Sequence, residues 1–233
     1  GLGDVYKRQF VEKAHAANCK VAVAADILSL ALLTPPGEWG ADIVFGTTQR
    51  LGTPMFYGGP SAAYFATRDE YKRNMPGRII GWSKDKYGKL CYRMALQTRE
   101  QHIKREKATS NICTAQALLA TMAGFYAVYH GPEGIRTIAE RIHSIAVFLE
   151  KSINRLGYKQ VNAQYFDTLR FALPGTISAQ QIRTIALSKE VNLRYFKNGD
   201  VGMSIDETTD IAAVNVLLSI FAIAAGRDWE KTS

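Results

Sequence analysis

The segment from Gly40 to Pro60 limits the fold of this chain more than any other. It contains a short apolar strand, Ile43–Phe45, then a small polar turn and a glycine-rich loop. In open α/β sheets, ligands bind at the carboxyl ends of strands, so the turn is where a site is expected. Gln49 would be presented there. An amine at this position would form a Schiff base with a carbonyl cofactor, whereas an amide cannot.

Strands and helices alternate through the first half of the chain. Strands are predicted over residues 20–25, from residue 40 onward and over 62–66. Asp26 follows the first strand and is either a site residue or the N-cap of a helix over 27–33. This alternation predicts an α/β fold with a parallel sheet and crossover helices.

The middle of the chain contains a short helix and then an excursion. The helix is expected over 69–74, and alternating apolar positions predict a hairpin over 78–96. A basic, polar stretch, 97–111, opens onto an apolar helix over 112–129, for which Ser110 or Asn111 would be the N-cap. Unpaired amides at that helix start would hold an anion.

A second pattern begins at residue 158, after a helix over 135–156 that ends at Gly157. It predicts a βαββα unit, in which Ser178–Gln181 has capping-box spacing. Its elements are a strand over 166–173, a helix over 182–187, strands over 191–196 and 201–205 joined by a hairpin turn, and a helix over 209–226.

Four segments follow from these patterns. Residues 1–9 are interpreted as a sequencing or assembly scar, because a transposase end used in sequencing libraries would encode Asp4–Gln9; the natural protein would then be cut at Phe10. The other segments are a partial large α/β domain over 10–131, a connecting helix over 132–157 and a small α+β domain over 158–233.

Composition excludes several classes of protein. The net charge of +8 suits an acidic partner, an anionic substrate or a nucleic acid, and equally a basic solvated surface. Three separated cysteines favour a reducing compartment over a disulfide scaffold or zinc cluster. The longest apolar runs fall short of the roughly 20 residues of a membrane span, so we expect no membrane partner.

Individual motifs carry little information. The glycines before Pro60 lack the Gly-Lys-Ser/Thr of a phosphate loop, and there is no G-x-S-x-G elbow. The four histidines have no metal-ligand spacing, so no metal is expected. The basic run at 102–107 has no interleaved aromatic residues, so we expect no nucleic-acid partner.

Longer stretches together resemble the P-protein of the glycine cleavage system. The resemblance covers residues 10 to about 229. It rests on PPGEWGAD at 35–42, YGGP at 57–60, MPGRIIG at 75–81, QTREQHI at 97–103, KATSNICTAQ at 107–116, YHGPEG at 129–134, NLR at 192–194 and VGMSIDETT at 201–209.

The resemblance implies the pyridoxal-phosphate fold type I, which is aspartate-aminotransferase-like. This enzyme consists of two related halves, and the chain looks like the N-terminal half or the corresponding separate subunit, without its beginning. Gln49 occupies the position of the Schiff-base lysine. Pyridoxal phosphate would therefore be held covalently by the lysine-bearing half, and Asp26 occupies the position of the pyridinium-pairing aspartate.

The family decarboxylates glycine and transfers the aminomethyl group to the lipoyl arm of H-protein. The implied partners are thus glycine, lipoylated H-protein and the lysine-bearing half. Because enzymes of this fold place sites at dimer interfaces, we expect Thr109, Ser110 and Asn111 to reach the phosphate of the partner's cofactor; plain helix capping is an equal alternative. Arg194 either faces a carboxylate or forms a structural salt bridge.

The basic residues give a second expectation, that they steer an acidic H-protein. They are Arg99, Lys104, Arg105 and Lys107. Two other roles stay open, namely a non-catalytic scaffold or regulatory subunit and a stand-alone pyridoxal enzyme using another lysine. The expected location is the cytoplasm of a bacterium, or the mitochondrion if the source is eukaryotic.

Overall fold

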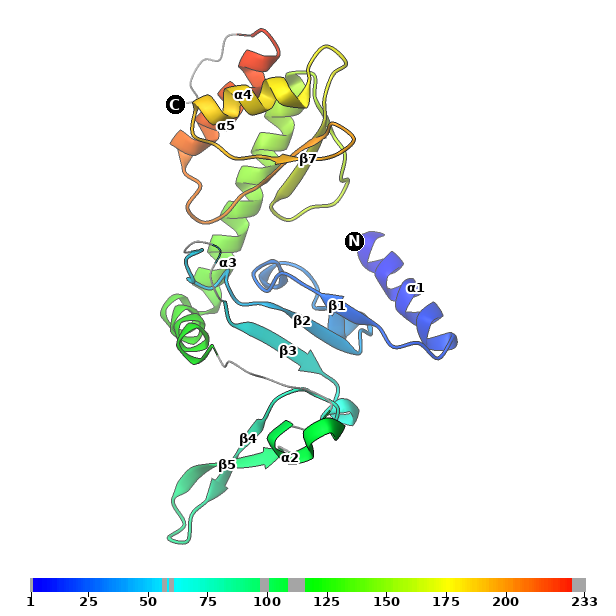
Figure 1. Cartoon of the computed structure of the whole chain (residues 1–233), viewed down its shortest axis with the longest axis vertical. Coiled ribbons are helices and arrows are strands. Elements are labelled where there is room, and N and C mark those ends of the chain that lie inside the picture. The colour runs from blue at the N-terminus through cyan, green and yellow to red at the C-terminus, as the bar shows by residue number, and fades with distance from the viewer. Residues whose placement is uncertain (1, 56–57, 59–60, 97–100, 109–115, 228–233) are drawn as a thin grey trace. The chain divides into compact units, whose positions relative to one another are not determined.

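The computed structural model describes residues 2–55, 58, 61–96, 101–108 and 116–227. The chain forms two compact units, the first comprising residues 1–30 and 34–129 and the second comprising residues 31–33 and 130–233 (Figure 1). Among the described residues, the first unit contains a three-stranded sheet and a two-stranded one, and the second unit contains a four-stranded sheet.

The three-stranded sheet of the first unit is mixed rather than parallel. Its strands lie in the order β1 (Ala22–Ala24), β2 (Ile43–Thr47) and β3 (Ala63–Thr67). β1 and β2 are parallel, but β3 is antiparallel to β2. The expectation of a parallel sheet is therefore wrong for β3. The 15 residues between β2 and β3 contain no described helix to carry the chain back across the sheet, so β3 returns beside β2 in the opposite direction.

Helix α1 (Leu2–Ala16) packs on this sheet through a small apolar core. The core consists of Val11, Val21, Trp39, Ala41 and Val44. Since α1 begins at Leu2, residues interpreted as a scar are helical here, and that interpretation stays a prediction.

Two predicted helices in this unit are single 3₁₀ turns. In place of a helix over 27–33 the chain forms η1 (Ser29–Ala31), because the Ser29 hydroxyl donates to the Asp26 carbonyl at 2.7 Å and competes with helical bonding. In place of a helix over 69–74 it forms η3 (Asp69–Tyr71). Another 3₁₀ turn is η2 (Pro36–Trp39).

The predicted hairpin is confirmed as β4 (Ile79–Lys84) paired with β5 (Leu90–Leu96). It is followed by the short α2 (Gln101–Lys104) and by η4 (Arg105–Lys107). Helix α3 (Ala117–Arg155) is interrupted at Gly131, whose φ of 62° and ψ of 179° are not helical. Two helices with a break near residue 131 are thus confirmed. Residues 112–115 of the first predicted helix lie outside the described residues.

The second unit has an antiparallel sheet in the order β6-β7-β9-β8. The strands are β6 (Lys159–Gln160), β7 (Thr168–Ala172), β8 (Arg194–Tyr195) and β9 (Val201–Ser204), and the helices are α4 (Ala179–Ser188) and α5 (Ile211–Ala224). The βαββα prediction is confirmed, although it missed the two-residue β6. The Ser178 hydroxyl caps α4 by accepting from the Gln181 amide at 3.2 Å.

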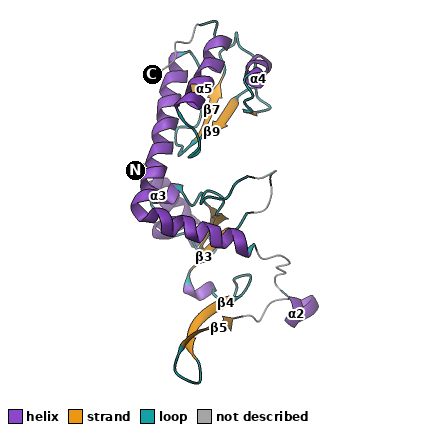
Figure 2. Ribbon diagram, turned by 90° about the vertical axis from the view of Figure 1, so that its left-hand side faces the viewer, coloured by secondary structure: helices purple, strands orange, loops and turns teal. Residues whose placement is uncertain are grey.

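Alternate residues of the strands in the second unit form its core. Leu169 and Phe171 of β7 are fully buried, and Phe171 contacts Phe221 of α5 with ring centroids 5.8 Å apart. Figure 2 shows α5 beside β7 and β9. Burial raises the pKa of Tyr158 to about 12, and its hydroxyl donates to the Phe221 carbonyl at 2.9 Å.

Asp42 is a buried carboxylate that joins several elements of the first unit. One of its oxygens accepts from the Val21 amide at 2.8 Å and contacts His15 Nε2 at 2.7 Å. Burial by itself would raise the pKa of Asp42. The hydrogen bonds from Val21 and His15 outweigh this, so its pKa lies below the usual value.

We therefore expect Asp42→Asn to reduce the free energy of unfolding by about 1–3 kcal/mol at neutral pH, measured by urea denaturation. Since the folded-state pKa is depressed, this contribution is complete above the ordinary aspartate pKa of about 3.9 and is lost as pH falls through the folded-state value. Asp69→Asn is the control, because Asp69 is exposed beside Lys72. Equal effects of the two substitutions would contradict the role of Asp42.

Candidate functional site

The parallel strands β1 and β2 end at the same edge of their sheet, and polar residues follow both. Asp26 follows β1, and Thr47 to Arg50 follow β2. The structure therefore brings Asp26 and the Gln49 turn to the same edge of the sheet. This group is the candidate site of the first unit.

Asp26 is held by contacts within the chain. Its Oδ1 accepts from the Leu28 amide at 2.9 Å, and its Oδ2 lies 3.5 Å from Arg50 Nε. The N-cap alternative for Asp26 is thus half right: the capping-type bond exists, but it starts a turn rather than a helix. Sequence reasoning missed Arg50, which is adjacent to Gln49 and is a cation at a strand end.

The Gln49 turn is fixed by its own backbone. The Gln49 amide donates to Thr47 Oγ1 at 3.1 Å, and the Gln49 carbonyl accepts from the Thr53 amide at 3.2 Å. Thr47 Oγ1 also lies 2.9 Å from Ser61 Oγ. Gln49 is half-buried. These contacts present its side chain from a closed turn instead of a long open loop.

Two threonines of this turn have hydroxyls that sequence reasoning did not single out. Thr48 and Thr53 are 9% and 6% exposed, and among the described residues neither hydroxyl has a hydrogen-bond partner. A buried unpaired hydroxyl costs about 1–3 kcal/mol. The available signal was a threonine in the polar turn and a second one in the glycine-rich loop that follows it.

The backbone approaches closely behind the turn. Tyr64 donates to the Ala25 carbonyl at 2.8 Å, and Gly46 lies against both groups: a Cβ at Gly46 would overlap the Ala25 carbonyl and lie 2.7 Å from the Tyr64 ring. Burial, and then the charge of Asp26, raise the pKa of Tyr64. The phenol is therefore a stable donor at neutral pH.

These residues do not fit a covalently held pyridoxal phosphate. Such a site needs an amine for the Schiff base and a partner for the pyridinium nitrogen. Position 49 is an amide, and the Asp26 carboxylate already accepts from Leu28 and lies beside the Arg50 guanidinium. Among the residues described at this edge, none of those named here offers an amine for a Schiff base.

The remaining residues with predicted cofactor or partner contacts divide between those outside and those inside the described ranges. Thr109, Ser110 and Asn111 lie outside the described residues, as does Arg99. Lys104, Arg105 and Lys107 are exposed on α2 and η4, the expected position for residues that steer a partner.

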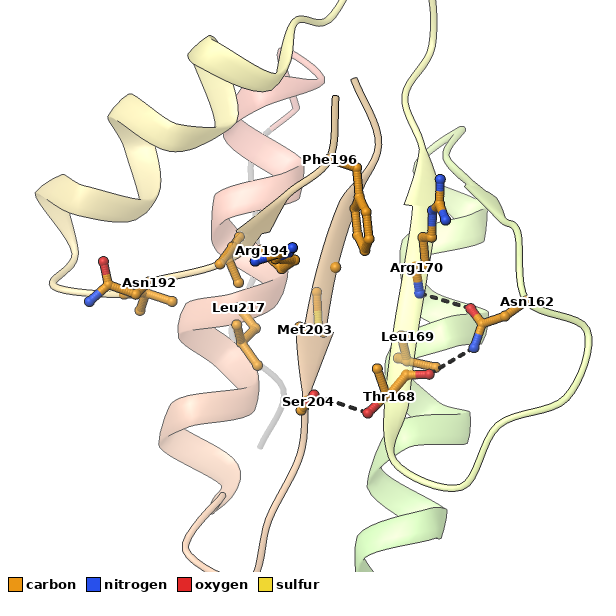
Figure 3. A pocket seen from close by; sticks show the side chains of 13 residues that line it. Asn162, Thr168, Leu169, Arg170, Asn192, Arg194, Phe196, Met203, Ser204 and Leu217 are labelled. Atoms are coloured by element: carbon orange, nitrogen blue, oxygen red, sulfur yellow. Dashed lines mark hydrogen bonds between the residues drawn. The ribbon is translucent and has the colours of Figure 1, made fainter. Parts of the chain in front are cut away.

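Arg194 lies in the second unit, in a cavity of about 710 Å³ on the sheet face shown in Figure 3. Its guanidinium lies 5.7 Å from the Phe196 ring centroid, and Arg170 lies 4.2 Å from the same centroid. Arg170 pairs with Asp200 at 2.7 Å. Within the described part of the chain no carboxylate pairs with Arg194, so the expected salt bridge is not found there.

The described residues form neither a cluster of metal ligands nor a membrane-spanning helix. Residues 2–55, 58, 61–96, 101–108 and 116–227 contain no group of three or more potential ligands able to hold a metal. Over the same ranges no helix is long and apolar enough to cross a membrane.

The fold is that of the pyridoxal-phosphate fold type I enzymes. A NifS-like protein from Rickettsia africae (TM-score 0.64, 13% identity, 94% of this chain and 57% of that one) and a Lactobacillus brevis glutamate decarboxylase (TM-score 0.62, 14% identity, 94% and 50%) share it. A crystal structure of glycine decarboxylase (P-protein) in inhibitor-bound form has a TM-score of 0.83 at 31% identity, over 92% of this chain and 51% of that one.

Sequence comparison identifies the family. The model of the glycine cleavage system P-protein matches residues 3–221. Glycine dehydrogenase (decarboxylating) of Bacteroides fragilis is 89% identical over 96% of this chain, and that of Nostoc punctiforme is 58% identical over 94%. The chain belongs to the P-protein family. It spans about a quarter of these relatives, namely 24% and 22% of their length.

We expect Gly46→Ala to destabilise the first unit by about 1–3 kcal/mol, because the added Cβ would force β2 away from Ala25 and Tyr64. Urea denaturation measures the change. Gly124→Ala in α3 is the matched control, since a Cβ there meets nothing within 4 Å and we expect no loss. A neutral Gly46→Ala would contradict the close approach.

Proposed function

We propose that this chain is part of the non-lysine half of a glycine decarboxylase, and that this half completes the active site of a lysine-bearing half. The observation that carries the proposal is Gln49: a chain that matches the P-protein family over residues 3–221 has an amide at the end of β2, where a cofactor-holding half needs an amine. The Asp26–Arg50 contact supports the same assignment.

The whole enzyme would decarboxylate glycine and pass the aminomethyl group to the lipoyl arm of H-protein. Pyridoxal phosphate, bound by the other half, would take up the electrons released by decarboxylation. This half would contribute Thr109, Ser110 and Asn111 to the cofactor phosphate, and its basic residues Arg99, Lys104, Arg105 and Lys107 would attract an acidic H-protein. Free cysteines and the bacterial relatives support a reducing bacterial cytoplasm as the setting.

The competing proposal is a scaffold that stabilises the catalytic half without touching the cofactor. The two differ in whether the side chains at 109–111 affect cofactor binding. The chain covers 51% of the chain in the P-protein structure and about a quarter of the curated relatives, which is compatible with both proposals.

In the complete enzyme we expect Thr109→Val to weaken pyridoxal phosphate retention about tenfold or more, because a hydrogen bond to a charged group is lost. Dialysis followed by the cofactor absorbance measures retention independently of activity. Thr137→Val is the control, since that hydroxyl bonds only its own helix at Glu133. Unchanged retention in Thr109→Val would favour the scaffold.

A further inference from the structure

One face of the β4–β5 hairpin is apolar and open to solvent. The pairs Ile80 with Met94, Trp82 with Tyr92 and Lys84 with Leu90 place their side chains on that face. We call Ile80, Trp82, Leu90, Tyr92 and Met94 the hairpin face. Trp82, Tyr92 and Leu90 are 75%, 76% and 69% exposed.

This exposure is unusual for a stable two-stranded element. Among the described residues β4 and β5 form a sheet of their own, and Figures 1 and 2 show no other strand beside it. An isolated hairpin is marginally stable in water, and a contiguous exposed apolar patch marks an interaction site. Trp82 and Tyr92 contact edge to face with centroids 6.0 Å apart, which presents a preformed aromatic surface.

The charges around this face indicate what covers it. Residues 78–96, the hairpin and its first flanking residue, contain five Lys and Arg against one Asp, which accounts for four of the eight net positive charges of the chain. The carboxylate of the hairpin turn, Asp85, already accepts from the Tyr87 and Lys89 amides. The complementary surface is therefore apolar at its centre and acidic at its rim.

We propose that the hairpin face docks on the part of the P-protein that lies outside this chain. About three-quarters of the length of the relatives is outside it, which provides the partner surface. A permanent interface is more apolar than a transient one, and the aromatic centre of this face is typical of a permanent interface. The partner is thus the remainder of the same enzyme. This inference rests on the proposed function in one respect only, namely that the chain is part of a complete P-protein.

A photo-cross-linking amino acid in place of Trp82, in the complete P-protein carrying this sequence, tests the proposal. We expect a cross-link to a peptide outside these 233 residues, in a stretch containing Asp and Glu. Tyr87 is the matched control position: it is 75% exposed and belongs to the same hairpin, but it lies in the turn. We expect the cross-linking yield from position 87 to be lower than that from position 82 by about tenfold or a larger factor.

Three results would overturn the proposal: no cross-link from position 82, a cross-link to the hairpin of a second copy, or one that forms only when H-protein is added. Position 92 repeats the test on the same face if replacing Trp82 disturbs folding. Thr109→Val should leave the cross-link unchanged. Loss of cofactor retention and loss of docking are therefore distinguishable, and one proposal can fail without the other.

Discussion

The parallel pairing of β1 with β2 is the constraint on which the candidate site depends. It places the residue after β1, Asp26, beside the turn after β2, and the close approach at Gly46 fixes the distance between them. With Arg50 beside Asp26, the edge is closed by an ion pair within the chain. This strand end is thus tied together by contacts within the chain.

This arrangement agrees with the division of labour that the family implies. Under the proposed function, a half without an amine at position 49 needs no free carboxylate at position 26, and an unpaired carboxylate in a partly buried site would cost free energy. Arg50 removes that cost. The exposed hairpin face and the basic residues of the hairpin itself then have a separate task, association with the rest of the enzyme.

Much of the local structure could be predicted from the sequence. The break at Gly131 and Pro132, the cap at Ser178 and the β4–β5 hairpin all follow from residues close together in the chain, where backbone preferences decide. What could not be predicted depends on contacts between distant residues or on local competition. Contacts between distant residues determine the direction of β3, the burial of Asp42 against His15 and the Asp26–Arg50 contact. Local competition for hydrogen bonds determines the 3₁₀ turn at Ser29.

The most direct test of the account is borohydride reduction of this chain alone with equimolar pyridoxal phosphate and glycine, followed by mass mapping of the adducts. Because no amine stands at the end of β2, the account predicts only scattered, substoichiometric labelling of surface lysines, unchanged by glycine. One lysine labelled stoichiometrically, with labelling that glycine displaces, would show that the chain holds the cofactor itself and would contradict the account.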